Sequence, residues 1–343
     1  MTDNNIKMIL KNAIKALKQN SDFPIDVKSK PNIKKGPSGI DSILEIHYQQ
    51  RKFTFFVEIK KNINNTVISF LLNRINQMSE KFLLVTRYVS KYNAEKLKEK
   101  NIQFIDNVGN VFINRFPLYI YISGNKPPED FQETRSNRLF QPSGLKLLFT
   151  LLSRPELIDK PYREIAHKAK IALGSVGWIM TDLKQLGFII DVKKRRKLIS
   201  KEKLLERWCI EYPVNLKPKL FIGRFNGPEN WWKNYNLKSK YGLWGGELAA
   251  DKLTKNLKPH DIAIYVCNYE FDKIIIDNKL YRDVNGNVEF LKCFWEAEST
   301  DKVNLTVHPI LIYADLLAAG SQRNTETANL IYDQYINKYL REN

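Results

Sequence analysis

The chain has 343 residues, 43% of them hydrophobic and 27% charged, which is the balance of a globular protein with room for two or three cores. No apolar run approaches the ~20 residues that a membrane-spanning helix needs, and the N-terminal pattern is not that of a signal peptide. The net charge of +18 favours a nucleic-acid partner, although Lys is abundant throughout and accounts for part of the excess.

Alternating strand-like and helix-like patterns predict an N-terminal α/β sandwich over residues 1–123. It opens with an amphipathic helix around Ile6–Leu17. Ser42–His47 and Phe53–Ile59 follow as two β-rich runs joined by a polar turn, which indicates a hairpin. The further elements expected here are helices at 67–80 and 91–99 and strands at 82–86, 102–105, 111–113 and 118–122.

One constellation in this region suggests chemistry. Asp41 begins the first hairpin strand, and Glu58 and Lys60 end the second on one face, because side chains alternate along a strand. If pairing brings Asp41 beside Glu58, two carboxylates could hold Mg²⁺ with its bound water next to the Lys60 ammonium, which is what attack on a phosphodiester requires.

These residues resemble the PD-(D/E)xK restriction-endonuclease-like superfamily. The resemblance implies that Asp41, Glu58 and Lys60 are catalytic and that Asp41 and Glu58 are metal ligands. The alternative is a nuclease-like scaffold with surface ion pairs and no catalysis, so enzymatic activity is not the favoured expectation. Asp106–Asn110 is interpreted first as a turn, with a role near Asp41 as the second option. Residues 124–141 are predicted to be a linker.

Residues 142–200 are predicted to form a winged helix-turn-helix that binds double-stranded DNA without a cofactor. Three amphipathic helices are expected, the third of which ends at Gly187, and the short β-type runs Phe188–Val192 and Leu198–Ser200 follow. Between the two runs lies an unbroken basic stretch, expected to be the tip of the wing and to contact phosphates: Lys193, Lys194, Arg195, Arg196 and Lys197. The alternative is a plain helical bundle with a solvated basic face.

The third helix of this module is in the recognition position but is poor in base-reading side chains. Ser175, Trp178 and Thr181 are predicted to face DNA, together with Gly174, Gly177 and Gln185. Direct readout favours Arg, Lys, Asn or Gln near the helix start, and the first two turns carry no cation. The wing is therefore expected to provide most of the affinity.

Residues 201–343 are predicted to be a separate α+β domain. A helix follows Ser200, Pro213 and Pro218 are expected to interrupt the chain, and a glycine pair, Gly245-Gly246, opens a second helix. That pair is interpreted as structural, with an anion cradle as the alternative. Strands are expected at 262–266, 273–276 and 289–295, and helices at 308–319 and 325–340. The 3 cysteines show no metal or redox spacing, which favours a reducing cytoplasm.

Four segments, taken in chain order, resemble the AbiEi-like family, the transcriptional regulators that serve as antitoxins of type IV toxin–antitoxin systems: Gly187–Ile190, Arg207-Trp208, Leu243–Ala250 and His308–Leu317. Leu83–Asn110 resembles the nuclease-like domain found in front of some members of that family. The resemblance implies a cytoplasmic regulator that binds its own promoter through the winged helix and offsets a nucleotidyltransferase-like toxin. A Mg²⁺-dependent endonuclease targeted by the winged helix remains the alternative.

Overall fold

The computed structural model describes residues 3–20, 26–31, 40–78, 81–127, 138–193, 195–267, 271–295 and 305–341. The chain divides into two compact units, Met1–Glu133 and Thr134–Asn343, and its architecture is mixed α/β. Most of the predicted linker, residues 128–137, lies outside the described residues. None of the helices in the described ranges is long and apolar enough to cross a membrane.

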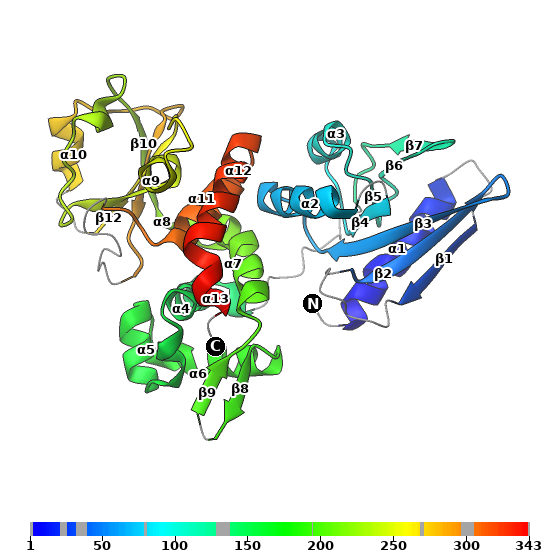
Figure 1. The fold of residues 1–343 in the computed structure, drawn as a ribbon, viewed down its shortest axis with the longest axis horizontal. Coiled ribbons are helices and arrows are strands. Elements are labelled where there is room, and N and C mark those ends of the chain that lie inside the picture. Colours follow the sequence, from blue (N-terminus) through cyan, green and yellow to red (C-terminus); the bar gives the residue numbers. More distant parts are fainter. Residues whose placement is uncertain are drawn as a thin grey trace. The chain divides into compact units, whose positions relative to one another are not determined.

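The first unit is a seven-stranded sheet whose strands follow one another in sequence order (Figure 1). The first three strands are antiparallel, the third to fifth are parallel, and the last three are antiparallel again. The elements are α1 (Asp3–Asn20), β1 (Asp26–Pro31), β2 (Ser42–Tyr48), β3 (Arg51–Lys60), α2 (Asn65–Met78), β4 (Phe82–Thr86), α3 (Lys91–Glu99), β5 (Phe104–Asp106), β6 (Val111–Arg115) and β7 (Leu118–Ile122).

Helix α1 covers one face of this sheet. Its apolar side, which includes Leu10, Ala13 and Leu17, packs against alternate residues of the strands in one buried cluster. On β3 these alternate residues are Phe53, Phe55, Val57 and Ile59. Since burying one such side chain contributes about 1.5–3 kcal/mol, this face accounts for much of the stability of the unit. Glu58 and Lys60 therefore lie on the other face, as predicted.

Helix α3 lies on that other face. Its Lys98 ammonium is 4.1 Å from the centroid of the Tyr121 ring, and Tyr121 alternates along β7 with Ile120 and Ile122, which pack on the α1 side. Lys96 of α3 donates to the Asn65 side chain of α2 at 2.6 Å, which joins the two crossover helices.

Most predicted elements of this unit are confirmed. The hairpin β2–β3 turns at Gln49 and Gln50, both with positive φ (46° and 64°), which suits the right-handed twist of the strands. One strand, β1, was not predicted, because a sequence as polar as Asp26–Pro31 carries little alternation.

The second unit begins with helices and a two-stranded hairpin and continues into a five-stranded sheet of order β11-β12-β14-β10-β13. The helical part comprises the 3₁₀ turn η2 (Arg138–Phe140), α4 (Pro142–Ser153), the turn η3 (Pro155–Asp159), α5 (Tyr162–Ala169), α6 (Leu173–Gln185), β8 (Ile189–Val192), β9 (Arg195–Leu198) and α7 (Lys201–Asn215).

The rest of this unit surrounds the sheet. It comprises α8 (Lys217–Leu220), β10 (Phe221–Asn226), the turn η4 (Trp231–Lys233), β11 (Gly242–Gly245), α9 (Gly246–Thr254), β12 (Ile262–Val266), α10 (Asp272–Asp277), β13 (Tyr281–Arg282), β14 (Val288–Lys292), α11 (Pro309–Ala319), α12 (Gln322–Ile331), a π-helical turn (Tyr332–Ile336) and α13 (Asn337–Arg341).

The helical part and the sheet share one core, centred on Phe149 of α4. Its ring lies 5.6 Å from that of Trp208 on α7 and 5.1 and 5.5 Å from those of Phe294 and Trp295, which follow β14. The Trp208 indole N–H donates to the carbonyl of Leu145 at 2.9 Å. Because a buried aromatic cluster couples the elements that share it, α7 joins the two parts firmly.

Two predictions for this unit are wrong. The run around Lys273–Ile276 is the helix α10 rather than a strand: only Ile274 of its isoleucines is buried, and Ile276 is 72% exposed. Pro213 does not end α7, which continues to Asn215 around it. The strands β10, β11 and β13 were not predicted.

Candidate nucleic-acid interface

The basic stretch of the hairpin is mostly strand, not loop. Val192 pairs with Arg195, so only two positions separate the paired strands, and Arg195, Arg196 and Lys197 belong to β9. Lys193 adopts φ 48°, while Lys194 lies outside the described residues. The prediction of a five-residue basic tip is therefore wrong, because pairing extends as far as a two-residue turn permits.

The cations of the hairpin differ in what they contact. The Arg196 guanidinium lies 4.9 Å from the Tyr162 ring and donates to the Lys160 carbonyl at 2.7 Å, so it holds β9 against the start of α5. The backbone N–H of Arg196 donates to the Asp159 carboxylate, and Arg195 lies 3.9 Å from the same carboxylate although it is 84% exposed. Lys193 and Lys197 are exposed.

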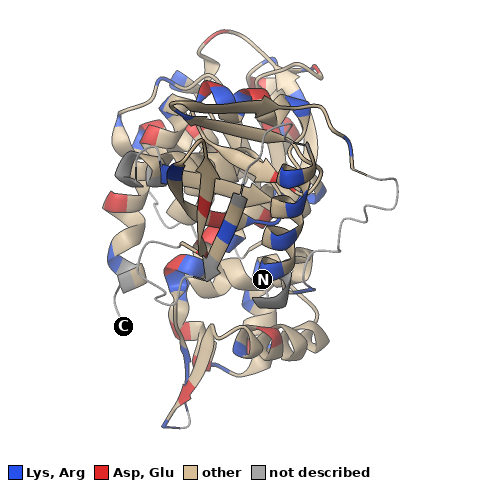
Figure 2. Cartoon of the chain, turned by 90° about the vertical axis from the view of Figure 1, so that its right-hand side faces the viewer, with Lys and Arg blue, Asp and Glu red and all other residues tan. Residues whose placement is uncertain are grey.

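Figure 1 shows the hairpin β8–β9 at the bottom of the view, and Figure 2, which colours the charged residues, shows acidic and basic residues together on it. Lys184, near the end of α6, forms an ion pair with Asp191 of β8. This pair and the Arg195–Asp159 contact partly neutralise the hairpin. The cations directed to solvent are therefore fewer than the sequence implied.

The outer side of α6 carries the predicted contact residues. Gly174, Trp178, Thr181 and Gln185 form one stripe at helical spacing; Trp178 is half-buried, and the other three are exposed. Ser175 is half-buried beside this stripe, and the Thr181 hydroxyl donates to the Gly177 carbonyl at 3.0 Å. Arg138, which lies in the stretch predicted to be a linker, also reaches this stripe: its guanidinium lies 4.7 Å from the centroid of the Trp178 ring.

The pairing of β2 with β3 brings Asp41 next to the end of β3. Asp41 accepts a hydrogen bond from the backbone N–H of Ile59 at 2.7 Å, and its own N–H donates to Val57. The Lys60 ammonium lies 2.9 Å from Glu58 Oε1, and the Glu58 side chain is buried. Each of these three groups thus has a partner within the protein.

Asp41 and Glu58 are the predicted metal ligands of this group. Carboxylates are the ligands that Mg²⁺ prefers, and Asp41 and Glu58 are of the right kind. Within the described ranges, however, no group of three or more His, Cys, Asp or Glu side chains could hold a metal ion. An ion-paired Glu58 and a strand-capping Asp41 fit a structural role.

Asp106 ends β5 and organises the turn that follows. One of its carboxylate oxygens accepts from the N–H groups of Val108 and Asn110, both at 2.9 Å. The other accepts from the N–H of Val89 and the side chain of Asn110, both at 2.8 Å. Burial raises the pKa of Asp106, and the four donors oppose that shift. This arrangement supports the interpretation of Asp106–Asn110 as a turn.

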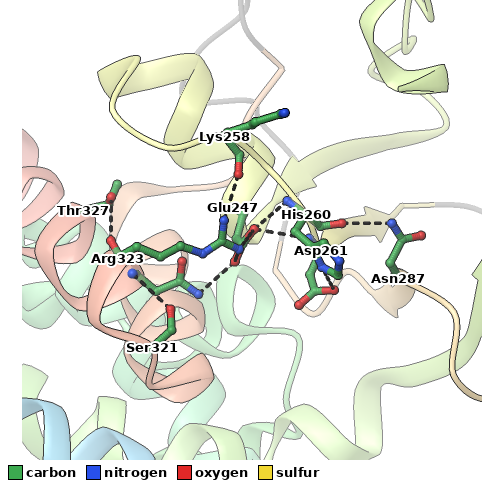
Figure 3. A network of polar contacts seen from close by, with 9 residues as sticks. Glu247, Lys258, His260, Asp261, Asn287, Ser321, Arg323 and Thr327 are labelled. Carbon is green, nitrogen blue, oxygen red and sulfur yellow. Dashed lines mark hydrogen bonds and ion pairs between the residues drawn. The ribbon is translucent and has the colours of Figure 1, made fainter. Parts of the chain in front are cut away.

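The segment Trp244–Glu247 holds the glycine pair and one buried carboxylate, Glu247, whose contacts are drawn in Figure 3. Packing and chain conformation account for the two glycines. A Cβ at Gly245 would lie 2.6 Å from the Tyr265 ring, and Gly246 has φ 52°. Glu247 then accepts from Arg323 at 2.7 and 2.9 Å and from the backbone N–H of His260 at 2.7 Å. A carboxylate in the first turn of α9 argues against the anion cradle.

A second buried network lies between α7, α8, the sheet and α11. The Lys217 ammonium is 3.0 Å from Asp315 and 3.1 Å from Glu289, and these two carboxylates raise the pKa of Lys217 against the opposing effect of burial. The hydroxyls of Tyr265 and Tyr212 donate to Asp315 at 2.8 and 3.3 Å. The sequence held no signal for this network, because its members are up to 103 residues apart.

The two buried networks, that of Glu247 and that of Lys217 with Asp315, both lie in the part of the chain for which a comparison with known proteins finds a match. No curated protein and no solved structure matches the chain. Residues 197–337, from within β9 to the first residue of α13, match a family model described as a transcriptional regulator, the AbiEi antitoxin of a type IV toxin–antitoxin system. Over these residues the chain is thus similar to the regulators and antitoxins of the AbiEi type.

Proposed function

We propose that the chain represses its own promoter through the module formed by α4–α6 and the β8–β9 hairpin, a winged helix-turn-helix, and offsets a partner toxin through its C-terminal domain. The observation that carries the proposal is the order of parts: three helices and a hairpin with exposed cations stand directly before a segment that matches a regulator family.

Three features of the module support a role in DNA binding. The buried side of α6, with Val176, Ile179 and Leu183, is fixed on α4 and α5, and this leaves the opposite side to solvent. Arg196 and Asp159 hold the hairpin at a set distance from α5. Lys193 in its turn and Lys197 on β9 are exposed cations, and the release of counterions from phosphates favours binding at such positions.

The proposal is tested with the full-length protein and the DNA upstream of its own gene. We expect tight binding to that DNA, weaker binding to unrelated DNA of the same length, and repression of a reporter driven by that promoter. We also expect co-expression to relieve the growth defect caused by the neighbouring gene when that gene encodes a toxin. Equal affinity for both DNAs together with an unrepressed reporter would refute autoregulation.

Neutralising the exposed hairpin lysines is expected to weaken binding to all DNA sequences alike. The double substitution Lys193→Ala and Lys197→Ala should lower the slope of log affinity against log salt by about 2, since each lost phosphate contact removes about one unit. The measurement is a titration by fluorescence anisotropy at four salt concentrations. Lys255→Ala with Lys258→Ala is the matched control, because both lysines are exposed in the C-terminal domain.

The salt slope of this control should match that of the unsubstituted protein. An unchanged slope in the hairpin variant, or an equal fall in both variants, would show that the hairpin does not contact phosphates.

A Mg²⁺-dependent endonuclease is the second candidate function, and the observation in its favour is that Asp41 lies beside the end of β3 that carries Glu58 and Lys60. If the first proposal holds, Lys60→Ala leaves promoter binding within about twofold of the original, because Lys60 belongs to the first unit and not to the proposed DNA-binding module. The nuclease proposal is tested by incubating the unsubstituted protein and Lys60→Ala with supercoiled and linear DNA and Mg²⁺ or Mn²⁺ and measuring DNA cleavage. Cleavage that Lys60→Ala abolishes would establish the nuclease instead.

A further inference from the structure

The first two turns of α6 carry no cation on their solvent-facing side. DNA-contacting helices commonly carry cations, but the one cation of α6, Lys184, lies in the last turn and is paired with Asp191. The first two turns present Gly174, Ser175 and Gly177 beside the large ring of Trp178.

A cation reaches this surface from another part of the chain. Arg138, in the turn η2 before α4, lies with its guanidinium 4.7 Å from the centroid of the Trp178 ring. At this distance the planar cation interacts with the electron-rich face of the indole, and stacking leaves the N–H groups at its edge able to bind elsewhere. Arg138 is exposed, so those donors reach solvent on the side of α6 that faces away from the core.

The turn that carries Arg138 is held rigidly. Leu139 and Phe140 next to it are buried, and the Arg207 guanidinium of α7 lies 4.5 Å from the Phe140 ring. The turn also passes so close to α4 that a Cβ at Gly144 would be 1.9 Å from the Leu139 carbonyl oxygen. Arg138 is therefore preorganised, which lowers the entropic cost of forming a contact.

The two glycines of α6 point to a partner outside this unit. Glycine destabilises a helix interior relative to alanine, so it is usually retained where a Cβ would clash or where φ is positive. Neither reason applies here, because a Cβ at Gly174 or Gly177 would meet nothing within 4 Å and neither residue has positive φ. Because neither glycine has a side chain, the helix backbone beside Trp178 is open to solvent, and a partner can approach it closely.

We propose that Arg138, positioned by the face of Trp178, is the DNA-contacting cation of the α6 surface, and that Gly174 and Gly177 make room for the duplex there. This inference rests on the DNA binding proposed above. The fork of the guanidinium suits a pair of acceptors, which DNA offers both at a phosphate and at the edge of a guanine.

The test measures binding of the full-length protein to its promoter DNA. Arg138→Ala is expected to weaken binding about tenfold, the loss typical of one arginine contact. Trp178→Ala should cost a similar factor although it removes no charge, because Arg138 then loses its support. The double variant should be little weaker than either single one, since coupled residues are not additive.

Arg282→Ala is the matched control for charge and stacking. Arg282 is also exposed, also lies over an aromatic ring (Phe225, at 5.8 Å), and belongs to the edge strand β13 of the C-terminal sheet. Its affinity for DNA should be unchanged. Equal losses in Arg138→Ala and Arg282→Ala, or no loss in Arg138→Ala, would overturn the inference, whereas failure of the unsubstituted protein to bind DNA would overturn the proposed function itself.

Gly177→Ala is expected to change protein stability and DNA affinity in opposite directions. It should raise the melting temperature, because alanine stabilises a helix, and yet weaken DNA binding, because the added methyl group meets the duplex. A variant that is more stable and binds DNA as well as the original would show that no duplex lies against this turn. A loss for Arg138→Ala that is equal on promoter and random DNA identifies a phosphate contact, and a loss confined to promoter DNA identifies a base contact; either result supports the inference.

Discussion

Replacing Lys217 by methionine is expected to destabilise the second unit by about 3 kcal/mol, near the lower limit for breaking a buried ion pair by removing one partner. The Lys217 side chain is 21% exposed, while those of Asp315 and Glu289 are 2% and 18% exposed. Methionine retains most of the volume of lysine but removes the ammonium. Asp315 then keeps its hydrogen bonds from the two tyrosines and has no cation, which makes its charge costly in the interior.

Tryptophan fluorescence during urea unfolding measures this effect selectively. All 6 tryptophans, of which Trp178 is the first in sequence, belong to the second unit, so the signal follows that unit alone. Lys219→Met is the matched control, because Lys219 lies in the same short helix and is exposed. It should shift the free energy of unfolding by less than about 0.5 kcal/mol, as surface substitutions usually do.

Adding Asp315→Asn to Lys217→Met should restore part of the loss, since the uncompensated charge is then removed. If Lys217→Met unfolds at the same urea concentration as Lys219→Met, the network does not stabilise the fold.

The position of this network gives it a second consequence. Tyr212 belongs to α7, and the same helix carries Trp208, which stacks on Tyr212 at 4.8 Å and donates to the Leu145 carbonyl of α4. A change at Asp315 is therefore linked to the proposed DNA-binding module through one helix and a continuous set of buried contacts. If that proposal holds, loosening the network is expected to weaken repression as well as to destabilise the C-terminal sheet and helices.

Elements with a strong apolar period could be predicted from the sequence, since local pattern and burial coincide in them. Strand β4 and helix α3 have the predicted bounds, and Phe53, Phe55 and Val57 all lie on the core face of β3, as expected. Strand β1 was not recognised, because it forms through its pairing with β2 rather than through its own polar residues. The segment of α10 was predicted to be a strand because its isoleucines are β-branched and such residues favour strands. Tertiary contacts override this preference here.

The candidate interface was predictable only in part. The stripe on α6 follows from helical periodicity, so Trp178 and Thr181 were found. Arg138 lies 40 positions before Trp178, in a stretch interpreted as linker, and nothing local indicates that the two stack. Likewise, the sequence cannot show that Arg196 turns back to Tyr162, because that contact depends on where the hairpin lies against α5.

Replacing Asp106 by alanine is expected to destabilise the first unit by about 3 kcal/mol, because it leaves buried N–H donors unpaired and each of these costs about 1–3 kcal/mol. The carboxylate serves the backbone N–H groups of Val89, Val108 and Asn110 at once, so it joins the end of β4 to the turn between β5 and β6. Asp106→Asn is expected to be nearly as harmful. The amide can accept on one side only, and its NH₂ group would face donors on the other.

Hydrogen exchange measured by mass spectrometry follows this unit, which holds none of the tryptophans. Peptides covering 82–115 should lose protection in Asp106→Ala, while the tryptophan transition of the second unit stays in place. Glu99→Ala, an exposed acid at the end of α3, is the control and should change neither signal. Retained protection in Asp106→Ala would mean that Asp106 does not hold the turn, and would reopen the alternative role for this carboxylate near Asp41, since it ends β5 two strands from Lys60.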